Sequence, residues 1–105
     1  MIVTVFRSRL RPGVREEYVA LVERMNALAQ TMPGYISHKG FWADDGERVT
    51  IVEFADEPSQ RAWAVNAQHV EAKKKGRADF YEEYKVQVCG VLRESAFKAK
   101  ESAAG

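Results

Sequence analysis

The feature that most constrains the fold is one helical periodicity placed directly after a strand-like segment. From Tyr18 to Met32, apolar residues recur at intervals of three or four, as in a helix that buries one face. Residues 2–10 instead alternate between two sets of side chains, which predicts a strand. A Pro-Gly pair follows each segment and marks its end. The chain therefore opens with a strand and then a helix.

The second half repeats these patterns in a different order. Residues 35–43 and 48–55 predict two strands, and Asp45-Gly46 between them predicts a tight hairpin, because glycine accepts a positive φ. Asp56 is a suitable N-cap for a second helix. We expect this helix to run unbroken through the stretch WAVNAQH, residues 63–69, until Gly76 ends or kinks it. A short helical or turn segment at residues 80–81 and a fourth strand at 84–93 complete the chain.

The order β-α-β-β-α-β predicts an α+β fold of the ferredoxin-like type. In that arrangement both helices cover one face of a four-stranded antiparallel sheet and leave the other face bare. A sheet with one solvated face should alternate cleanly between apolar and polar residues. The first strand does not, since Ile2 and Phe6 lie on one face and Val3 and Val5 on the other. We therefore expect a second copy of the chain to cover the bare face, giving a homodimer.

Composition narrows the classes of partner and compartment. Sixteen Lys and Arg residues against fifteen Asp and Glu give a net charge of +1, so no global field favours nucleic acid or an anionic membrane. The single cysteine, Cys89, permits neither an intrachain disulfide nor a cysteine-based metal site. We expect it to be buried, and the protein to be cytoplasmic. Arg7 and Arg9 interrupt the first apolar run, which argues against a signal peptide or a transmembrane span.

Several stretches together resemble one known family. They are MPGY after the first helix, the hairpin DDGERVTIVEF, and AWAVNAQHVEAKKKGRADFYEEYKVQVCGVLR. These residues resemble the antibiotic biosynthesis monooxygenase domain over residues 1–97, which leaves 98–105 as a loosely held tail. The resemblance implies a dimeric α+β barrel with a pocket between the helices and the sheet of each subunit. The family includes oxygenases of quinols and anthrones that need no flavin or metal, and also haem-degrading monooxygenases.

The resemblance favours the cofactor-free branch, with molecular oxygen as co-substrate. Haem degraders carry an Asn on the first strand, and this chain has none there. His69 also follows Trp63 more closely than in those enzymes, so haem is not expected. Anthrone oxygenases place a helix Asn before their Trp, whereas Asn66 comes after Trp63 here. The site must therefore be argued from the residues themselves.

Trp63, Asn66 and His69 are the first candidates. On a continuous helix with Trp63 at zero, Asn66 falls near 300° and His69 near 240°, so both flank the face that Trp63 turns toward the sheet. Trp63 either anchors the core or walls a pocket. Asn66 either lines the pocket or makes a local hydrogen bond. His69 is either a general base near neutral pH or a partly exposed helix histidine.

Other candidates lie on the strands and after the second helix. His38 has room beside Gly40 and either contacts a ligand, as the alternative to His69 for taking the substrate proton, or sits in an interface. Glu53 is either paired with a cation or serves as a base with a raised pKa. We expect a substrate pocket formed by five residues: Phe6, Trp63, Arg77, Tyr81 and Tyr84. The expected function is cofactor-independent monooxygenation of a small quinol or polycyclic phenol such as an anthrone. The alternative is a non-catalytic small-molecule-binding or stress-response dimer.

Overall fold

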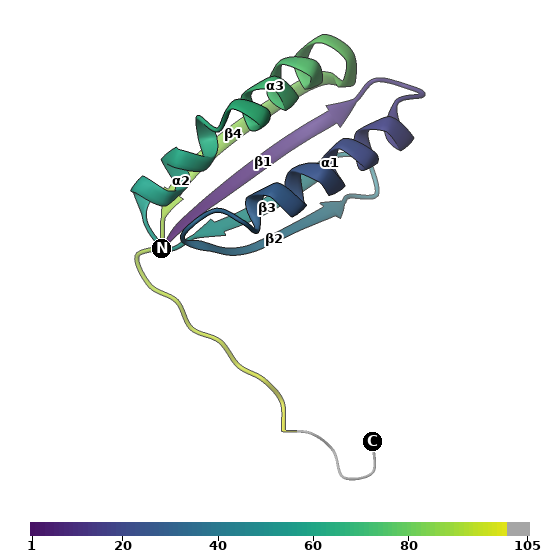
Figure 1. Cartoon of the computed structure of the whole chain (residues 1–105). Helices are drawn as coiled ribbons and strands as arrows, with labels where there is room; N and C mark the ends of the chain where they lie inside the picture. The colour runs from purple at the N-terminus through teal and green to yellow at the C-terminus, as the bar shows by residue number, and fades with distance from the viewer. Residues whose placement is uncertain (101–105) are drawn as a thin grey trace.

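The structure is a computed structural model that describes residues 1–100. The elements are β1 (Ile2–Leu10), α1 (Arg15–Ala29), β2 (Tyr35–Trp42), β3 (Arg48–Phe54), α2 (Glu57–Ala64), α3 (Ala67–Lys75), a π-helical turn η1 (Gly76–Phe80) and β4 (Tyr81–Gly90). The strands form one antiparallel sheet in the order β2-β3-β1-β4. All helices lie on one face of this sheet (Figure 1). The ferredoxin-like α+β fold is thus confirmed.

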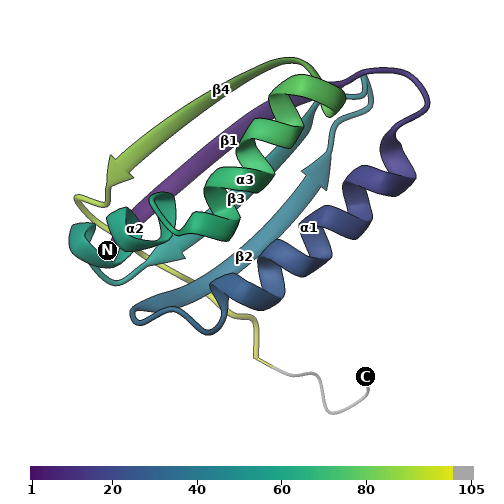
Figure 2. The same cartoon turned by 45° about the horizontal axis from the view of Figure 1, so that its top comes forward.

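The helices form one layer of two segments, α1 and α2–α3. Both views show these segments running beside each other over the same face of the sheet (Figure 2). The core under α1 and α2 holds Ala29, Val52, Phe54 and Trp63, all buried. Aromatic packing of Tyr18 against Phe80, at 6.0 Å between ring centroids, closes the other end. These contacts fix the helical segments to the sheet and to each other, and so set the spacing between them.

The expectation that the second helix runs unbroken through residues 63–69 was wrong. The helix ends at Ala64, and a new helix begins at Ala67 after Asn66 takes an extended conformation with ψ 131°. The Asn66 Oδ1 accepts hydrogen bonds from the backbone N–H of Gln68 at 3.0 Å and of His69 at 3.3 Å. Asparagine favours such local bonds over a helix interior, so its side chain starts a new helix instead of continuing the old one. The first cap is as expected, because Asp56 accepts from Ser59 N–H at 2.9 Å.

The fourth strand lies three residues earlier than expected. Ile2 pairs with Gly90 and Leu10 pairs with Tyr81, so the length of β1 sets both ends of β4. Tyr81 therefore belongs to the strand, and only Phe80 to the preceding turn. Gly76 kinks the helical segment without ending it, since α3 passes directly into η1 there.

The face opposite the helices combines an apolar centre with a polar end. The alternation of the strands turns Val3, Val5, Ile51 and the 45 % exposed Phe41 toward this open face. Cys89, the partner of Val3, is exposed on it, so the expectation of a buried cysteine was wrong. The open face is wide and unpaired in the single chain because no helix crosses it (Figure 1).

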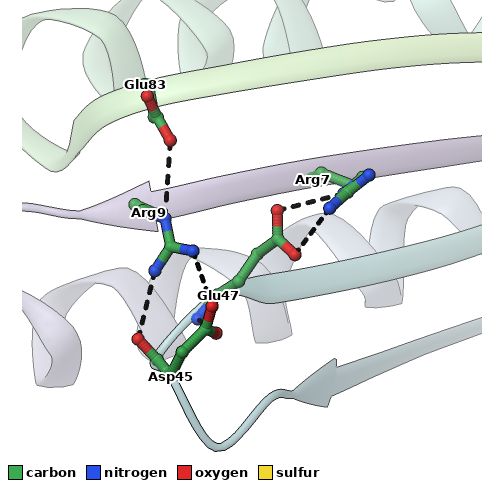
Figure 3. A network of polar contacts seen from close by, with 5 residues as sticks. All are labelled: Arg7, Arg9, Asp45, Glu47 and Glu83. Atoms are coloured by element: carbon green, nitrogen blue, oxygen red, sulfur yellow. Dashed lines mark hydrogen bonds and ion pairs between the residues drawn. The ribbon is translucent and has the colours of Figure 1, made fainter.

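Ion pairs tie the end of the open face together. Arg7 makes a two-point contact with Glu47, at 3.0 and 2.9 Å, and Arg9 binds Asp45 at 2.8 Å. Arg9 also reaches Glu83 at 3.4 Å, so β1 is linked both to the β2–β3 turn and to β4 (Figure 3). The two arginines hold the pKa of the Asp45 and Glu47 carboxyls below their usual values by hydrogen bonding.

The expectation that Glu53 is either paired with a cation or serves as a base was wrong. The Glu53 carboxylate accepts a hydrogen bond from the Ser37 hydroxyl, and none of the ion pairs among residues 1–100 involves it. Glu53 pairs with Val3 and therefore belongs to the open face, away from the helices. It is neither paired with a cation nor placed to act as a base between helix and sheet.

The chain leaves the sheet after β4. Residues 91–100 follow β4 without helix or strand and run away from the sheet (Figure 1). Of the expected tail, 98–105, the last five residues lie outside the described part. No helix within residues 1–100 has both the length and the apolar character needed to cross a bilayer.

Candidate functional site

A cavity of about 420 Å³ lies between the sheet and the two helical segments, α1 and α2–α3. Its volume falls within the range typical of small-molecule pockets. Nine apolar side chains line it, namely Phe6, Leu21, Val22, Val52, Trp63, Ala64, Ala72, Val86 and Val88. Ten residues with polar groups line it as well, namely Thr4, Tyr18, His38, Thr50, Gln60, His69, Lys73, Arg77, Tyr81 and Tyr84, and the tyrosine rings add to the aromatic wall. A pocket that combines aromatic and apolar walls with placed polar groups suits a small aromatic ligand.

The cavity brings together seven of the eight residues expected at the site. They are Phe6, His38, Trp63, His69, Arg77, Tyr81 and Tyr84. Asn66 is the exception, because it does not line the cavity. Its Oδ1 caps α3, and its Nδ2 lies 3.9 Å from the Met32 Sδ. Of the two interpretations of Asn66, the local hydrogen bond describes what the structure shows.

Trp63 and His69 form one stacked unit on the cavity wall. Their ring centroids are 4.1 Å apart with an angle of 10° between the planes. The break between α2 and α3 permits this arrangement, because it turns His69 back over the last turn of α2. Trp63 is buried and packs in the core, and it also lines the cavity, so both interpretations of this residue hold.

A hydrogen bond to the Trp63 backbone fixes which nitrogen of His69 carries the proton. Its Nδ1 lies 3.0 Å from the Trp63 carbonyl oxygen, which can only accept a hydrogen bond. Nδ1 therefore carries the proton, and Nε2 of the neutral ring is left as an acceptor. Burial lowers the pKa of His69 below its usual value, and the Lys73 charge adds to this against the opposing effect of the Trp63 carbonyl. The ring is thus neutral at pH 7 and able to take up a proton at Nε2.

His38 faces the cavity from β2, on the side that the helices cover. Burial is the largest cause of its lowered pKa, and the positive charge of Arg48 is the next. The space expected beside His38 at Gly40 is already filled. A Cβ on Gly40 would collide with the Arg48 guanidinium, which lies directly over this glycine. The missing side chain at Gly40 therefore leaves room for the Arg48 guanidinium, and not for a ligand beside His38.

An aromatic cluster forms the wall on the β1–β4 side. Phe6 stacks on Tyr84 at 5.5 Å and meets Tyr81 at 5.4 Å between ring centroids. Burial raises the pKa of Tyr81 far above its usual value, with Tyr18 contributing second. Tyr81 therefore keeps its proton and acts as a hydrogen-bond donor. Tyr84 is 41 % exposed, which places it near the opening over β4.

Five polar residues that line the cavity were absent from the sequence-based set, namely Thr4, Tyr18, Thr50, Gln60 and Lys73. Arg48 was absent too, and its guanidinium lies over Gly40 on the same side of the sheet. The signal for Thr50 and Arg48 was available, because period-two alternation in β3 puts them on the same face as Val52. Thr50 and Arg48 can be selected as site candidates only once that face is known to be the one that the helices cover. Among residues 1–100, no three His, Cys, Asp or Glu side chains gather as metal ligands would.

Comparison with known proteins places this geometry in a family. The family model described as antibiotic biosynthesis monooxygenase matches residues 1–75. The chain belongs to this family. A curated relative in this comparison is the uncharacterized protein YqjZ of Bacillus subtilis, 32% identical over 81 residues, which span 77% of this chain and 71% of the relative.

Solved structures of antibiotic biosynthesis monooxygenase relatives share the fold. Rv0793 from Mycobacterium tuberculosis superposes with a TM-score of 0.80 at 18% identity, covering 90% of this chain and 98% of that one. SnoaB from Streptomyces nogalater, a cofactor-independent oxygenase, superposes with a TM-score of 0.77 at 17% identity, covering 89% and 94%. At these identities the likeness concerns the fold alone.

Proposed function

We propose that this protein is a cofactor-independent monooxygenase that acts on a small quinol or polycyclic aromatic phenol. The observation that carries the proposal is the fixed tautomer of His69, whose Nδ1 is held by the Trp63 carbonyl. An apolar cavity with a neutral, oriented imidazole is what deprotonation of a phenol requires. The family membership supports the same class of reaction, and SnoaB is an example of it.

In the proposed reaction, His69 Nε2 takes the hydroxyl proton of the substrate. The resulting anion is electron-rich and passes one electron to molecular oxygen, giving a substrate radical and superoxide. These two radicals combine to form a carbon–oxygen bond. The peroxide takes a proton back from the imidazolium and loses water, so one oxygen atom stays in the product as a carbonyl. Trp63 and Phe6 would hold the ring, and Arg77 and Tyr84 the substrate oxygens.

The proposal includes a homodimer that joins two open faces, and a cytoplasmic location. The apolar centre of the open face, around Val5 and Ile51, supports the dimer. The single cysteine supports a reducing compartment. Nucleic acid and membrane are not expected as partners, since the net charge is close to zero.

Oxygen uptake tests the proposed activity. Purified protein is given a panel of reduced naphthoquinols and anthrones, and its rate is compared with uncatalysed autoxidation. We expect uptake well above that background, falling at least about tenfold in His69→Gln because the base is lost. Gln68→Ala is the matched control, since Gln68 is exposed on the same turn of α3 and does not line the cavity. A rate equal to autoxidation across the panel would contradict the proposal.

One observation favours a non-catalytic binding protein as the second candidate. Asn66, the only asparagine of the helical stretch, is occupied in capping α3 and offers no donor to the cavity. A binding protein would take up the same aromatic compounds without consuming oxygen. The two candidates therefore separate in one experiment, by comparing ligand affinity with oxygen uptake. An absorption spectrum of the purified protein tests in addition whether it carries haem, through a Soret band.

A further inference from the structure

Arg48 lies at one end of the cavity and takes no part in the function proposed above. Facing rows of β1 and β3 line the cavity floor, first Thr4 with Val52 and then Phe6 with Thr50. The next row on the same face is Ser8 with Arg48. Ser8 and Arg48 are not part of the cavity wall but form the row directly beyond its floor, toward the β2–β3 turn, and we call this pair the inner end.

The Arg48 guanidinium leans from its own row toward β2 and the row of Thr50, which lines the cavity floor. It lies over Gly40, which is the partner of Thr50 in the neighbouring strand. The Trp42 ring centroid is 4.8 Å from its Cζ on one side, and the Tyr18 ring centroid is 5.9 Å away on another. Aromatic faces hold a cation in place without neutralising its charge. The guanidinium is therefore fixed in position, with its charge still available.

No acidic side chain accompanies this charge. Ion pairs within residues 1–100 engage Arg7, Arg9, Lys74 and Lys75, and none engages Arg48. The Arg48 Nε is buried and has no hydrogen-bond partner in the described chain. The nineteen residues that line the cavity include neither Asp nor Glu. A half-buried arginine without a carboxylate is unusual, because burial of an unpaired charge is unfavourable.

Ser8, the register partner of Arg48 on β1, is a second unsatisfied group. Its side chain is 2 % exposed, and its Oγ has no partner among residues 1–100. Buried hydroxyls in folded proteins nearly always have a partner. Because Ser8 and Arg48 are partners in the sheet register, an anionic oxygen placed over this row would satisfy both groups.

We propose that the inner end is an anion subsite, in which Arg48 and Ser8 bind a carboxylate carried by the aromatic substrate. The inference rests on the proposed function, and it narrows the substrate from quinols in general to ring-carboxylated quinols or phenols. The carboxylate at the inner end would leave the hydroxyl of the same ring system toward His69. Arg48 is thus a specificity-determining residue, because it selects among quinols by charge and does not move the proton.

The test compares two quinols that differ only in the carboxylate. Naphthalene-1,4-diol and its 2-carboxylic acid are titrated into the purified protein by calorimetry under anaerobic conditions, so that binding is measured without turnover. We expect the acid to bind about tenfold or more tightly than the diol, because charge-assisted hydrogen bonds are strong. Arg48→Met should abolish this preference and leave the affinity for the diol within about threefold of the unaltered protein.

Two further variants separate binding from folding. Arg15→Met is the matched control, since Arg15 also stacks on Trp42, at 4.1 Å, but lies on the exposed side. It should keep the full preference for the acid. Ser8→Ala removes an unsatisfied buried hydroxyl, so it should fold as stably as the original or more so. It should nevertheless weaken binding of the acid about fivefold and leave the diol unchanged.

The possible outcomes distinguish this inference from the function on which it rests. If the diol binds and is oxygenated but the acid has no advantage, the anion subsite is wrong and the oxygenase proposal stands. The same conclusion follows if Arg48→Met keeps the preference. If neither compound binds, the cavity is not a quinol site, and both proposals fail. A preference lost in Arg48→Met and in Ser8→Ala, but kept in Arg15→Met, supports the subsite.

Discussion

At the scale of single residues, the structure assigns different tasks to neighbours in one short stretch. Trp63 supplies a core side chain, a cavity wall and a carbonyl that orients His69. Asn66 supplies a cap, and this cap places His69 in the first turn of a new helix. A catalytic role for His69 depends on Asn66 for position, although Asn66 itself does not reach the cavity.

The pH dependence of oxygen uptake follows from the lowered pKa of His69. Below its pKa the imidazole is protonated and cannot act as a base, so the rate should fall as the pH drops through that value. Since burial lowers the pKa, this loss should be centred below the ordinary histidine value of about 6.5. Rates measured between pH 5 and 8 on one quinol check the prediction, after subtraction of autoxidation.

Two controls accompany this pH profile. His69→Gln should leave a low rate without the same inflection, whereas His38→Gln should retain it. An inflection that survives in His69→Gln and disappears in His38→Gln would assign the base to His38, whose pKa is also lowered by burial.

Asn66→Ala tests the cap. The substitution removes the acceptor for the Gln68 and His69 N–H groups, so it should lower the free energy of unfolding by about 1 kcal/mol. Asn66→Asp keeps the acceptor and should retain both stability and oxygen uptake. Denaturant unfolding and oxygen uptake on the two variants check this. A loss of activity in Asn66→Asp at unchanged stability would show that the amide has a direct role in the reaction.

At the scale of elements, the passage from α3 through η1 to β4 shapes one end of the cavity. A Cβ on Gly76 would come within 2.5 Å of the Tyr81 Cε2, so the helix can approach the strand only where the side chain is absent. Tyr81 in turn packs on Phe6, Tyr18 and Tyr84. The position of the kink therefore controls the aromatic wall.

Gly76→Ala tests this close approach. Helix propensity alone would make alanine more stable by about 1 kcal/mol. The collision with Tyr81 should reverse that sign and destabilise the protein by about 1–3 kcal/mol, with reduced affinity for quinols. Gly90→Ala is the matched control, because a Cβ there meets nothing within 4 Å, and it should be neutral. Thermal unfolding of both variants measures the change in stability. A Gly76→Ala protein that is more stable than the original would contradict the predicted collision with Tyr81.

At the scale of the whole molecule, the open face is the surface that should join two chains. Ile51 lies at its apolar centre, so Ile51→Lys should convert the expected dimer to a monomer by burying a charge in the interface. Light scattering after size-exclusion chromatography measures the mass. Val65→Lys is the control, because Val65 is 68 % exposed between α2 and α3 and lies away from that face. A dimer that persists in Ile51→Lys would place the contact elsewhere.

Much of the fold was accessible from local patterns. Period-two and period-three-to-four spacing gave the order of strands and of the main helices, since each pattern reflects a buried face within one element. Asp45-Gly46 located the hairpin, where Gly46 has φ +92°. Asp56 located the first residue of α2, because a cap is a contact between near neighbours in sequence.

Other features depend on residues far apart in the chain. The ends of β4 follow from the length of β1, and pairing across the sheet cannot be seen in residues 81–93 alone. Burial of Cys89 was expected from its residue type, but its position opposite Val3 on the open face makes it exposed. The hydrogen-bond partner of Glu53 is Ser37 on the adjacent strand, whereas a cation was expected.

The sequence by itself determined which side chains could meet on one face, since the periodicity of each element fixes the direction of its residues. Seven of the eight residues expected at the site line one cavity in the structure, although the continuous helix on which His69 was placed does not exist. Only the tertiary structure decided that Asn66 turns the chain, that His69 stacks on Trp63, and that Arg48 fills the space over Gly40. Each of these depends on how separate elements pack together, and packing is set by long-range contacts that local sequence patterns do not encode.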